Sequence, residues 1–241
     1  MRETSHLTVV ALALCVLLAG CSGFGLGGEG GAPTAEEVTA GIDSVDSYSM
    51  EVVRTLESVG VNETIELSGV VDRADREARI ERTTVSSLGD ERRVTQYIID
   101  GVEYVDGESG WESAPLADGA WSEIDRLRGA VTALESTEFD RVGTEEIAGT
   151  ETVIYELDLG TETQDELVGA NESSHVPTVI EEFRYYVSVD TETGTLYRTD
   201  LRALVAQGEG NARFTVETTF TDHNEPVDVR LPDDAPTEGE D

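Results

Sequence analysis

Cys21 is the residue of this chain whose type and position most clearly suggest chemistry. It follows a mostly apolar run from Leu7 to Ala19, and Arg2 lies ahead of that run. The run has 13 residues, whereas a permanent membrane-spanning helix needs about 20. A short basic start, an apolar middle and small residues at the end are typical of a secretory signal peptide. We therefore predict that residues 1–20 are a signal peptide that is removed.

The residues Leu18-Ala19-Gly20-Cys21 resemble the lipobox of secreted lipoproteins. The resemblance implies that the peptidase cuts before Cys21 and that its sulfur carries a lipid. Cys21 would then anchor the protein to the extracellular face of the cell membrane. The alternative is an ordinary signal peptide followed by a coincidental cysteine. Cys15 leaves with the signal peptide, so we expect no disulfide and no thiolate metal site.

The charge of the chain is strongly negative. It contains 51 acidic and 16 basic residues, a net charge of -35, and every basic residue is an arginine. This composition excludes nucleic acid as a partner, because a phosphate backbone needs cations to neutralise it. An acid-rich chain without lysine resembles the proteins of extremely halophilic archaea, whose carboxylates are screened in concentrated salt. We therefore expect the fold to be less stable in dilute buffer than in molar KCl.

The sequence carries no recognisable enzyme motif. It lacks the Gly-x-Ser-x-Gly, Ser-x-x-Lys and P-loop patterns, although an unrecognised hydrolase stays an alternative. We expect no cofactor and no metal. Outside the signal peptide the histidines are His175 and His223, both in predicted loops, where exposure to solvent is the simpler interpretation. The acidic stretch 106–112 lacks the spacing of an EF-hand.

Two motifs match the acceptor for N-glycosylation, Asn62-Glu-Thr64 and Asn171-Glu-Ser173. Both fall in predicted loops, so Asn62 and Asn171 are possible glycosylation sites.

A glycine-rich tether, residues 21–33, follows the signal peptide and leads to a single domain that we place at 34–232. Residues 233–241 are predicted to be an acidic disordered tail. Thr34 is a candidate N-cap for a helix over about 35–45. Alternating apolar and polar residues then predict a series of strands up to Trp111, and Asp100-Gly101 is a strong hairpin signal between two of them.

From Trp121 to Leu134 the apolar residues recur every three or four positions, which predicts one or two helices. Strands resume after about residue 142, with a short helix predicted near 161–170. Three strands, over about 180–189, 196–205 and 212–220, are expected to end the sheet.

This order of elements, together with the lipobox, resembles the lipoprotein carriers of the LolA, LolB and LppX/LprG type. The stretch from Tyr97 to Trp111 carries the local likeness. The resemblance implies an α+β fold in which a strongly curved antiparallel β-sheet forms a half-open barrel with helices on its concave face. In those carriers an acyl chain lies between helix and sheet.

The resulting hypothesis is a lipoprotein that binds a lipid or another hydrophobic molecule in this cavity. Trp111, Trp121, Leu127 and Val131 are candidate cavity residues, and the alternative is that they form an ordinary core. If the core is filled, the protein is instead a non-enzymatic surface interaction or accessory module with a protein partner.

Overall fold

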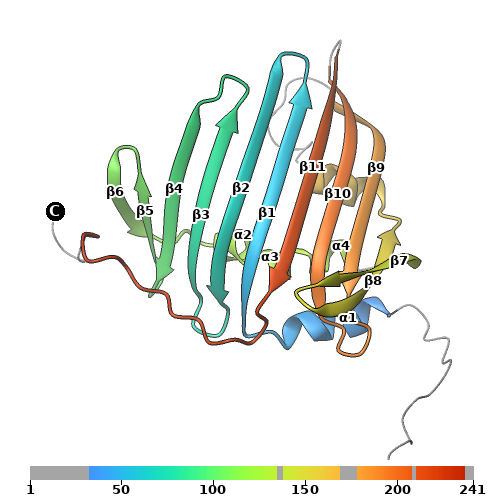
Figure 1. Ribbon diagram of the computed structural model, residues 1–241, viewed down its shortest axis with the longest axis horizontal. Helices are drawn as coiled ribbons and strands as arrows, with labels where there is room; N and C mark the ends of the chain where they lie inside the picture. The colour runs from blue at the N-terminus through green and yellow to red at the C-terminus, as the bar shows by residue number, and fades with distance from the viewer. Residues whose placement is uncertain (1–32, 135–137, 169–177, 208–209, 237–241) are drawn as a thin grey trace, which may run out of the picture. The chain divides into compact units, whose positions relative to one another are not determined.

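The computed structural model describes residues 33–134, 138–168, 178–207 and 210–236, in which one large antiparallel sheet dominates (Figure 1). Eleven strands pair in the order β6-β5-β4-β3-β2-β1-β11-β10-β9-β8-β7. Their bounds are β1 Ser47–Ser58, β2 Val61–Asp72, β3 Glu77–Ser86, β4 Glu91–Ile99, β5 Val102–Gly107, β6 Gly110–Pro115, β7 Phe139–Ile147, β8 Thr150–Leu157, β9 Thr178–Val189, β10 Leu196–Gln207 and β11 Gly210–Thr221. In this described part, no helix is both long and apolar enough to cross a membrane.

Two meanders, β1 to β6 and β7 to β11, form the sheet and join where β1 pairs with β11. β6 and β7 are the two edges, so the sheet is open. The sequence predicted an α+β half-open barrel with helices on its concave face. The coarser outline of that prediction is confirmed: the described chain is mostly β and forms one open antiparallel sheet with a few short helices.

One face of the sheet is apolar, and we call it the inner face. On β1, Met50 and Val52 are buried, whereas Glu51 between them points to the opposite, outer face. The register extends this alternation across neighbouring strands, because Val52 lies opposite Leu67 on β2 and Thr218 on β11. The predicted hairpin at Asp100-Gly101 is confirmed as the turn between β4 and β5.

The helices are short: α1 Ala35–Asp43, α2 Trp121–Ile124, α3 Arg126–Gly129, α4 Val131–Leu134 and α5 Thr161–Val168. Figure 1 shows α2, α3 and α4 behind the strands of the sheet. Ile124, Leu127 and Leu134 from these helices join the main hydrophobic core together with the inner-face side chains of the sheet. The helices therefore cover part of the inner face.

The helix α1 begins as the sequence predicts. Thr34 caps it, and Glu37 completes a capping box in which its carboxylate accepts the Thr34 backbone N–H at 2.8 Å. These hydrogen bonds from Thr34 lower the pKa of the Glu37 carboxyl. Gly41 lies directly against the turn between β9 and β10, where a Cβ would come within 2.3 Å of the Gly194 carbonyl oxygen. This close backbone contact requires glycine on the helix.

The segment from Trp121 to Leu134 forms three one-turn helices, where the sequence predicted one or two. Asp125 makes the first break, because its φ of -73° and ψ of 78° lie outside the helical region. Its carboxylate accepts the backbone N–H of Arg128 at 3.1 Å and so caps α3.

Candidate ligand-binding cavity

A hollow of about 460 Å³ lies between the helices and the inner face, and we call it the helix-covered cavity. Its volume is within the range of about 300–1,000 Å³ that is usual for small-molecule sites. The floor consists of apolar side chains from β1, β2, β9, β10 and β11, namely Val52, Ile65, Leu67, Tyr185, Leu201, Phe214, Val216 and Phe220. The roof is formed by Ser122, Glu123, Arg126, Gly129, Ala130 and, from α5, Leu167.

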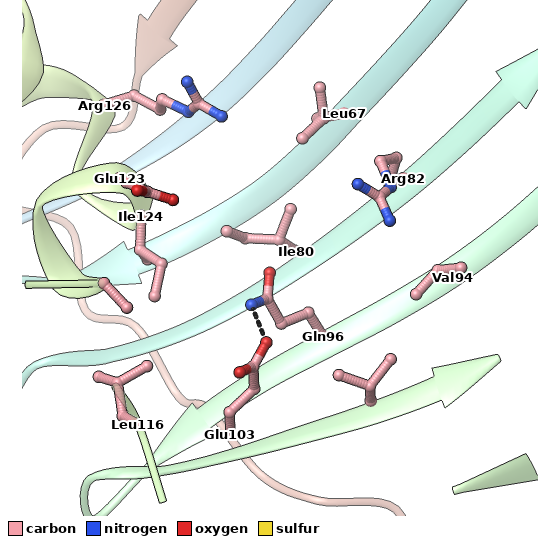
Figure 2. A pocket seen from close by; sticks show the side chains of 12 residues that line it. Leu67, Ile80, Arg82, Val94, Gln96, Glu103, Leu116, Glu123, Ile124 and Arg126 are labelled. Carbon is pink, nitrogen blue, oxygen red and sulfur yellow. Dashed lines mark hydrogen bonds between the residues drawn. The ribbon is translucent and has the colours of Figure 1, made fainter. Parts of the chain in front are cut away.

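A second hollow of about 370 Å³, the side cavity, lies beside the first and extends towards β4 and β5 (Figure 2). The two cavities share the lining residues Leu67, Arg82, Glu123 and Arg126, so they are direct neighbours. On the wall of the side cavity, the Gln96 amide donates a hydrogen bond to the Glu103 carboxylate at 2.6 Å.

Positive charge gathers at the helix-covered cavity. Arg54 from β1, Arg82 from β3 and Arg126 from α3 line it, against Glu123 as the one acidic residue of the lining. All three arginines are exposed, and the Arg54 guanidinium lies 4.9 Å from the centre of the Phe214 ring on the floor. Within the described residues, none of these three arginines makes an ion pair.

A buried polar network holds the roof over the sheet. The Asp125 carboxylate, 4% exposed, accepts a hydrogen bond from Arg73 Nε at 2.9 Å and one from the Tyr48 hydroxyl at 3.1 Å. The Arg73 guanidinium also donates to the backbone carbonyls of Ile42 and Val45 at the end of α1. The network thus ties together α1, the turn after β2, strand β1 and the start of α3.

Two buried tyrosines, one in the polar network and one on the cavity floor, have raised pKa values. Burial, assisted by the negative charge of Asp125, raises the pKa of Tyr48 well above its usual value. Burial also raises the pKa of Tyr185 on the cavity floor to about 12, while a hydrogen bond with Thr199 opposes the increase. Both hydroxyls are therefore protonated at neutral pH.

Part of the roof presents small residues to the cavity, at Gly129 and Ala130. A Cβ at Gly129 would meet a single atom, the Ser122 carbonyl oxygen, at 4.0 Å. Ala130 follows it in the chain, and both line the helix-covered cavity. Leu127 and Leu134 of these helices are buried in the main core and do not line the cavity.

The four candidate cavity residues do not come together in the structure. Leu127 and Val131 are buried in the main core and are absent from the lining of both cavities. Trp121 is half-buried at the edge of that core, where the Arg76 guanidinium lies 5.5 Å from its ring centre. These three residues therefore fit the alternative interpretation, in which they form part of an ordinary hydrophobic core.

Trp111 lies in a different cluster. It contacts Tyr97, with ring centres 5.9 Å apart, in a second core that also contains Tyr104 and Val229. The register gives the reason. Trp111 on β6 lies opposite Asp106 on β5, and this position belongs to the outer face of the sheet, as do those of Tyr97 and Tyr104. The C-terminal segment after β11 covers this cluster, so the prediction that Trp111 shares a cavity with Leu127 is wrong.

The other predicted sites are placed as follows. Asn62 is exposed in the second position of β2, at the hairpin end instead of in a loop. His223 is half-buried against the Tyr197 ring and contacts the Leu196 carbonyl oxygen at 3.2 Å, which corrects the expected solvent position. Burial lowers its pKa. Cys21, Asn171 and His175 lie outside the described residues, as do residues 1–32 with the signal peptide and tether.

The described residues contain no group of three histidine, cysteine or acidic side chains that could hold a metal ion. What sequence reasoning missed is the set of cavity arginines. A signal for two of them was present, because Arg54 and Arg82 occupy positions that the strand alternation assigns to the apolar inner face.

No family model matches this chain, and no curated protein matches it either. Among solved structures, the chain is similar to the lipoprotein LppX of Mycobacterium tuberculosis, with a TM-score of 0.51 and 18% identity over 81% of this chain and 95% of that chain. At this identity the likeness shows the fold alone.

Weaker matches are the MucA/MucB complex of Pseudomonas aeruginosa and a DUF1329 family protein of Desulfovibrio piger. The first has a TM-score of 0.33 and 15% identity over 85% of this chain and 58% of that chain. The second has a TM-score of 0.26 and 9% identity over 80% of this chain and 93% of that chain. Neither score is high enough to carry an argument.

Proposed function

We propose that this protein is a non-enzymatic lipoprotein that binds a lipid or another hydrophobic molecule in the helix-covered cavity. In this proposal Cys21 carries the lipid that anchors the chain to the extracellular face of the cell membrane. The inner face is then the concave side of a half-open barrel, and the helices on it cover the bound molecule.

The observation that carries the proposal is an unfilled hollow with an apolar floor beneath a roof that is firmly attached. The hollow of about 460 Å³ is partly open to solvent, because Ser122, Glu123, Arg126 and Gly129 on its roof are exposed, and its floor is apolar. Gly129 and Ala130 add little bulk to the roof, and the Asp125 network keeps the roof in place above the hollow.

The energetics suit a lipid tail. Burying an acyl chain stabilises a complex by about 0.8 kcal/mol per CH₂, so a dozen carbons contribute on the order of 10 kcal/mol. Association costs about 4–15 kcal/mol in lost freedom of motion. A floor that is already formed keeps this cost towards the lower end, because few side chains need to be ordered.

The similarity to LppX supports the proposal at the level of the fold, since that protein is a lipoprotein by name. A shared fold does not by itself determine function. The alternative, a surface module with a filled core, requires the space between helices and sheet to be occupied by side chains. The two cavities count against that alternative.

The test is a variant that fills the cavity from its floor. Val216 on β11 is partly buried and lines the helix-covered cavity, so we expect Val216→Trp to occupy the space of a ligand. The matched control is Val53→Trp, since Val53 lies on the outer face of the neighbouring strand and is 42% exposed.

Dodecanol binding, measured by isothermal titration calorimetry, is the readout. We expect Val216→Trp to weaken it at least tenfold and Val53→Trp to leave it unchanged, with both variants retaining cooperative thermal unfolding. Equal dodecanol affinity in both variants would refute the cavity as the binding site, and a wild-type protein that binds no dodecanol would refute the proposed function.

A further inference from the structure

We propose that the helix-covered cavity selects amphiphiles with an anionic headgroup, a carboxylate or a phosphate, which Arg54, Arg82 and Arg126 bind while the apolar tail lies on the floor. This inference rests on the proposed function, because it names the class of hydrophobic molecule that the cavity takes.

The first support is the absence of ion pairs at these three arginines. Acidic residues outnumber arginines by 51 to 16, so an arginine on this protein easily finds a carboxylate. At least eight arginines of the described part do so: Arg73, Arg79, Arg93, Arg128, Arg184, Arg198, Arg202 and Arg230. The cavity arginines make no such pair within the described residues, and neither do Arg76, Arg92, Arg141 and Arg213. Of these described arginines, only the cavity arginines gather around the helix-covered cavity, where their positive charge is available to a ligand.

The second support is their place in the register. Arg54 follows Val52 on the inner face of β1, and Arg82 on β3 lies opposite Leu67 on β2. Charged side chains at apolar register positions are costly when they are covered by a filled core. Here Arg54 and Arg82 line a hollow and are exposed, so their charged ends stay hydrated.

The third support is the geometry at the junction of the two cavities. Arg82 and Arg126 line both cavities, and Figure 2 shows that they extend into the space from opposite sides, one from β3 and one from α3. Guanidinium groups bind carboxylates and phosphates through paired hydrogen bonds, which makes arginine well suited to such headgroups. A headgroup held at this junction leaves the tail to follow the apolar floor beneath α3, past Val216 and Tyr185.

The negative charge of the whole protein makes the positive lining of the cavity a local exception. A net charge of -35 repels anions from most of the surface. The helix-covered cavity reverses this locally, with three arginines against one glutamate. Low-dielectric walls concentrate such a local field, so an anion is more stable in the cavity than at the surrounding surface.

The experiment uses four ligands with the same tail: dodecanoate, dodecyl phosphate, dodecanol and dodecyltrimethylammonium. Each is titrated into the purified full-length protein by isothermal titration calorimetry at 0.15 M KCl, below its critical micelle concentration. We expect at least one of the two anions to bind about tenfold more tightly than dodecanol, and the cation to bind most weakly. Whichever anion binds more tightly identifies the headgroup as a carboxylate or a phosphate.

Arginine variants then assign the preference to its source. We expect Arg82→Gln and Arg126→Gln each to reduce anion affinity about three- to tenfold, and the double variant to remove the preference over dodecanol. Dodecanol affinity falls by a clearly smaller factor than anion affinity in these variants. The matched control is Arg213→Gln, since Arg213 lies on the outer face of β11 and, within the described chain, makes no ion pair.

The outcomes separate this inference from the proposed function. If dodecanol binds as tightly as both anions, the headgroup selection is refuted and the hydrophobic site stands. If the arginine variants weaken all four ligands equally, the arginines support the cavity instead of binding a headgroup, and the inference again fails. If none of the four ligands binds, the proposed function itself fails.

Discussion

Arg73 lies in the turn between β2 and β3 and Arg82 lies on β3, and their surroundings are opposite. The Arg73 side chain is 13% exposed and donates to Asp125 and to two backbone carbonyls. Arg82 lines two cavities and, in the described part of the chain, has no carboxylate partner. The first arginine holds elements of the fold together, and the second is free to contact something that the chain itself does not provide.

In a very acidic protein, the partners of an arginine indicate its role. Because carboxylates are abundant, an ion pair at the surface carries little information and contributes at most about 1 kcal/mol. An arginine that avoids such pairs is the more informative observation, especially where several converge on a hollow. By this criterion the buried network is structural, and the cavity arginines are the candidates for contact with a ligand.

The largest expected effect comes from breaking the structural side of this comparison with Asp125→Ala. Removing this carboxylate leaves Arg73 and the Tyr48 hydroxyl buried without their partner. Breaking a buried pair in this way typically costs about 3–5 kcal/mol, so we expect that loss in the free energy of unfolding measured with urea. Asp43→Ala, which breaks the exposed pair with Arg128, is the control and should cost less than about 1 kcal/mol. Similar losses in the two variants would contradict the structural role of the network.

A smaller effect is expected at alkaline pH, where Tyr185 on the cavity floor titrates. Its pKa of about 12 in the folded protein exceeds the value of 10 in the unfolded chain. The folded state therefore holds this proton more tightly, and its contribution to stability is complete below pH 10 and lost as the pH rises towards 12. One pKa unit corresponds to about 1.4 kcal/mol, so Tyr185→Phe should flatten the decrease in unfolding free energy between pH 10 and 11 by about 1 kcal/mol.

The matched control for that measurement is Tyr186→Phe, because Tyr186 follows in the chain and points to the outer face beside Arg202. A Tyr185→Phe variant with the same pH dependence as wild type would contradict the burial of this hydroxyl at the cavity.

The smallest expected effect is that of salt concentration, which should weaken ligand binding by the cavity arginines and leave the buried Arg73 network unchanged. The Debye length falls from about 10 Å at 0.1 M to about 3 Å at 1 M salt, and partly exposed charges are screened more than buried ones. We expect the preference for the more tightly bound anion over dodecanol to fall two- to threefold between 0.1 M and 1 M KCl. The destabilisation caused by Asp125→Ala should stay constant over the same range. A preference that does not change with salt would show that the headgroup contact is not electrostatic.

The strands and their turns were predictable because their signals are local. Alternation of apolar residues located β1 to β5 and β8 to β11, and Asp100-Gly101 located a hairpin between two of them. The capping box at Thr34 and Glu37 located the start of α1 for the same reason. Each signal lies within a few residues and depends on no distant contact.

The site was harder to predict because it depends on contacts between residues far apart in the sequence. Asp125 breaks the predicted helix because Tyr48 and Arg73, 77 and 52 residues away, hold its carboxylate. The convergence of Arg54 and Arg82 with Arg126 depends on the position of the roof, which that network sets. Trp111 was assigned to the wrong face because the residue pattern within β6 does not show which face of the sheet the helices cover.

The pairing of β1 with both β2 and β11 has a mechanical consequence. The chain enters the sheet through a central strand, directly after α1. Tension along β1 must therefore shear two ladders of hydrogen bonds at once, whereas a strand at an edge would peel away from a single neighbour. A pull on the chain ahead of α1, directed along β1, thus acts on two ladders of hydrogen bonds and not on a single one.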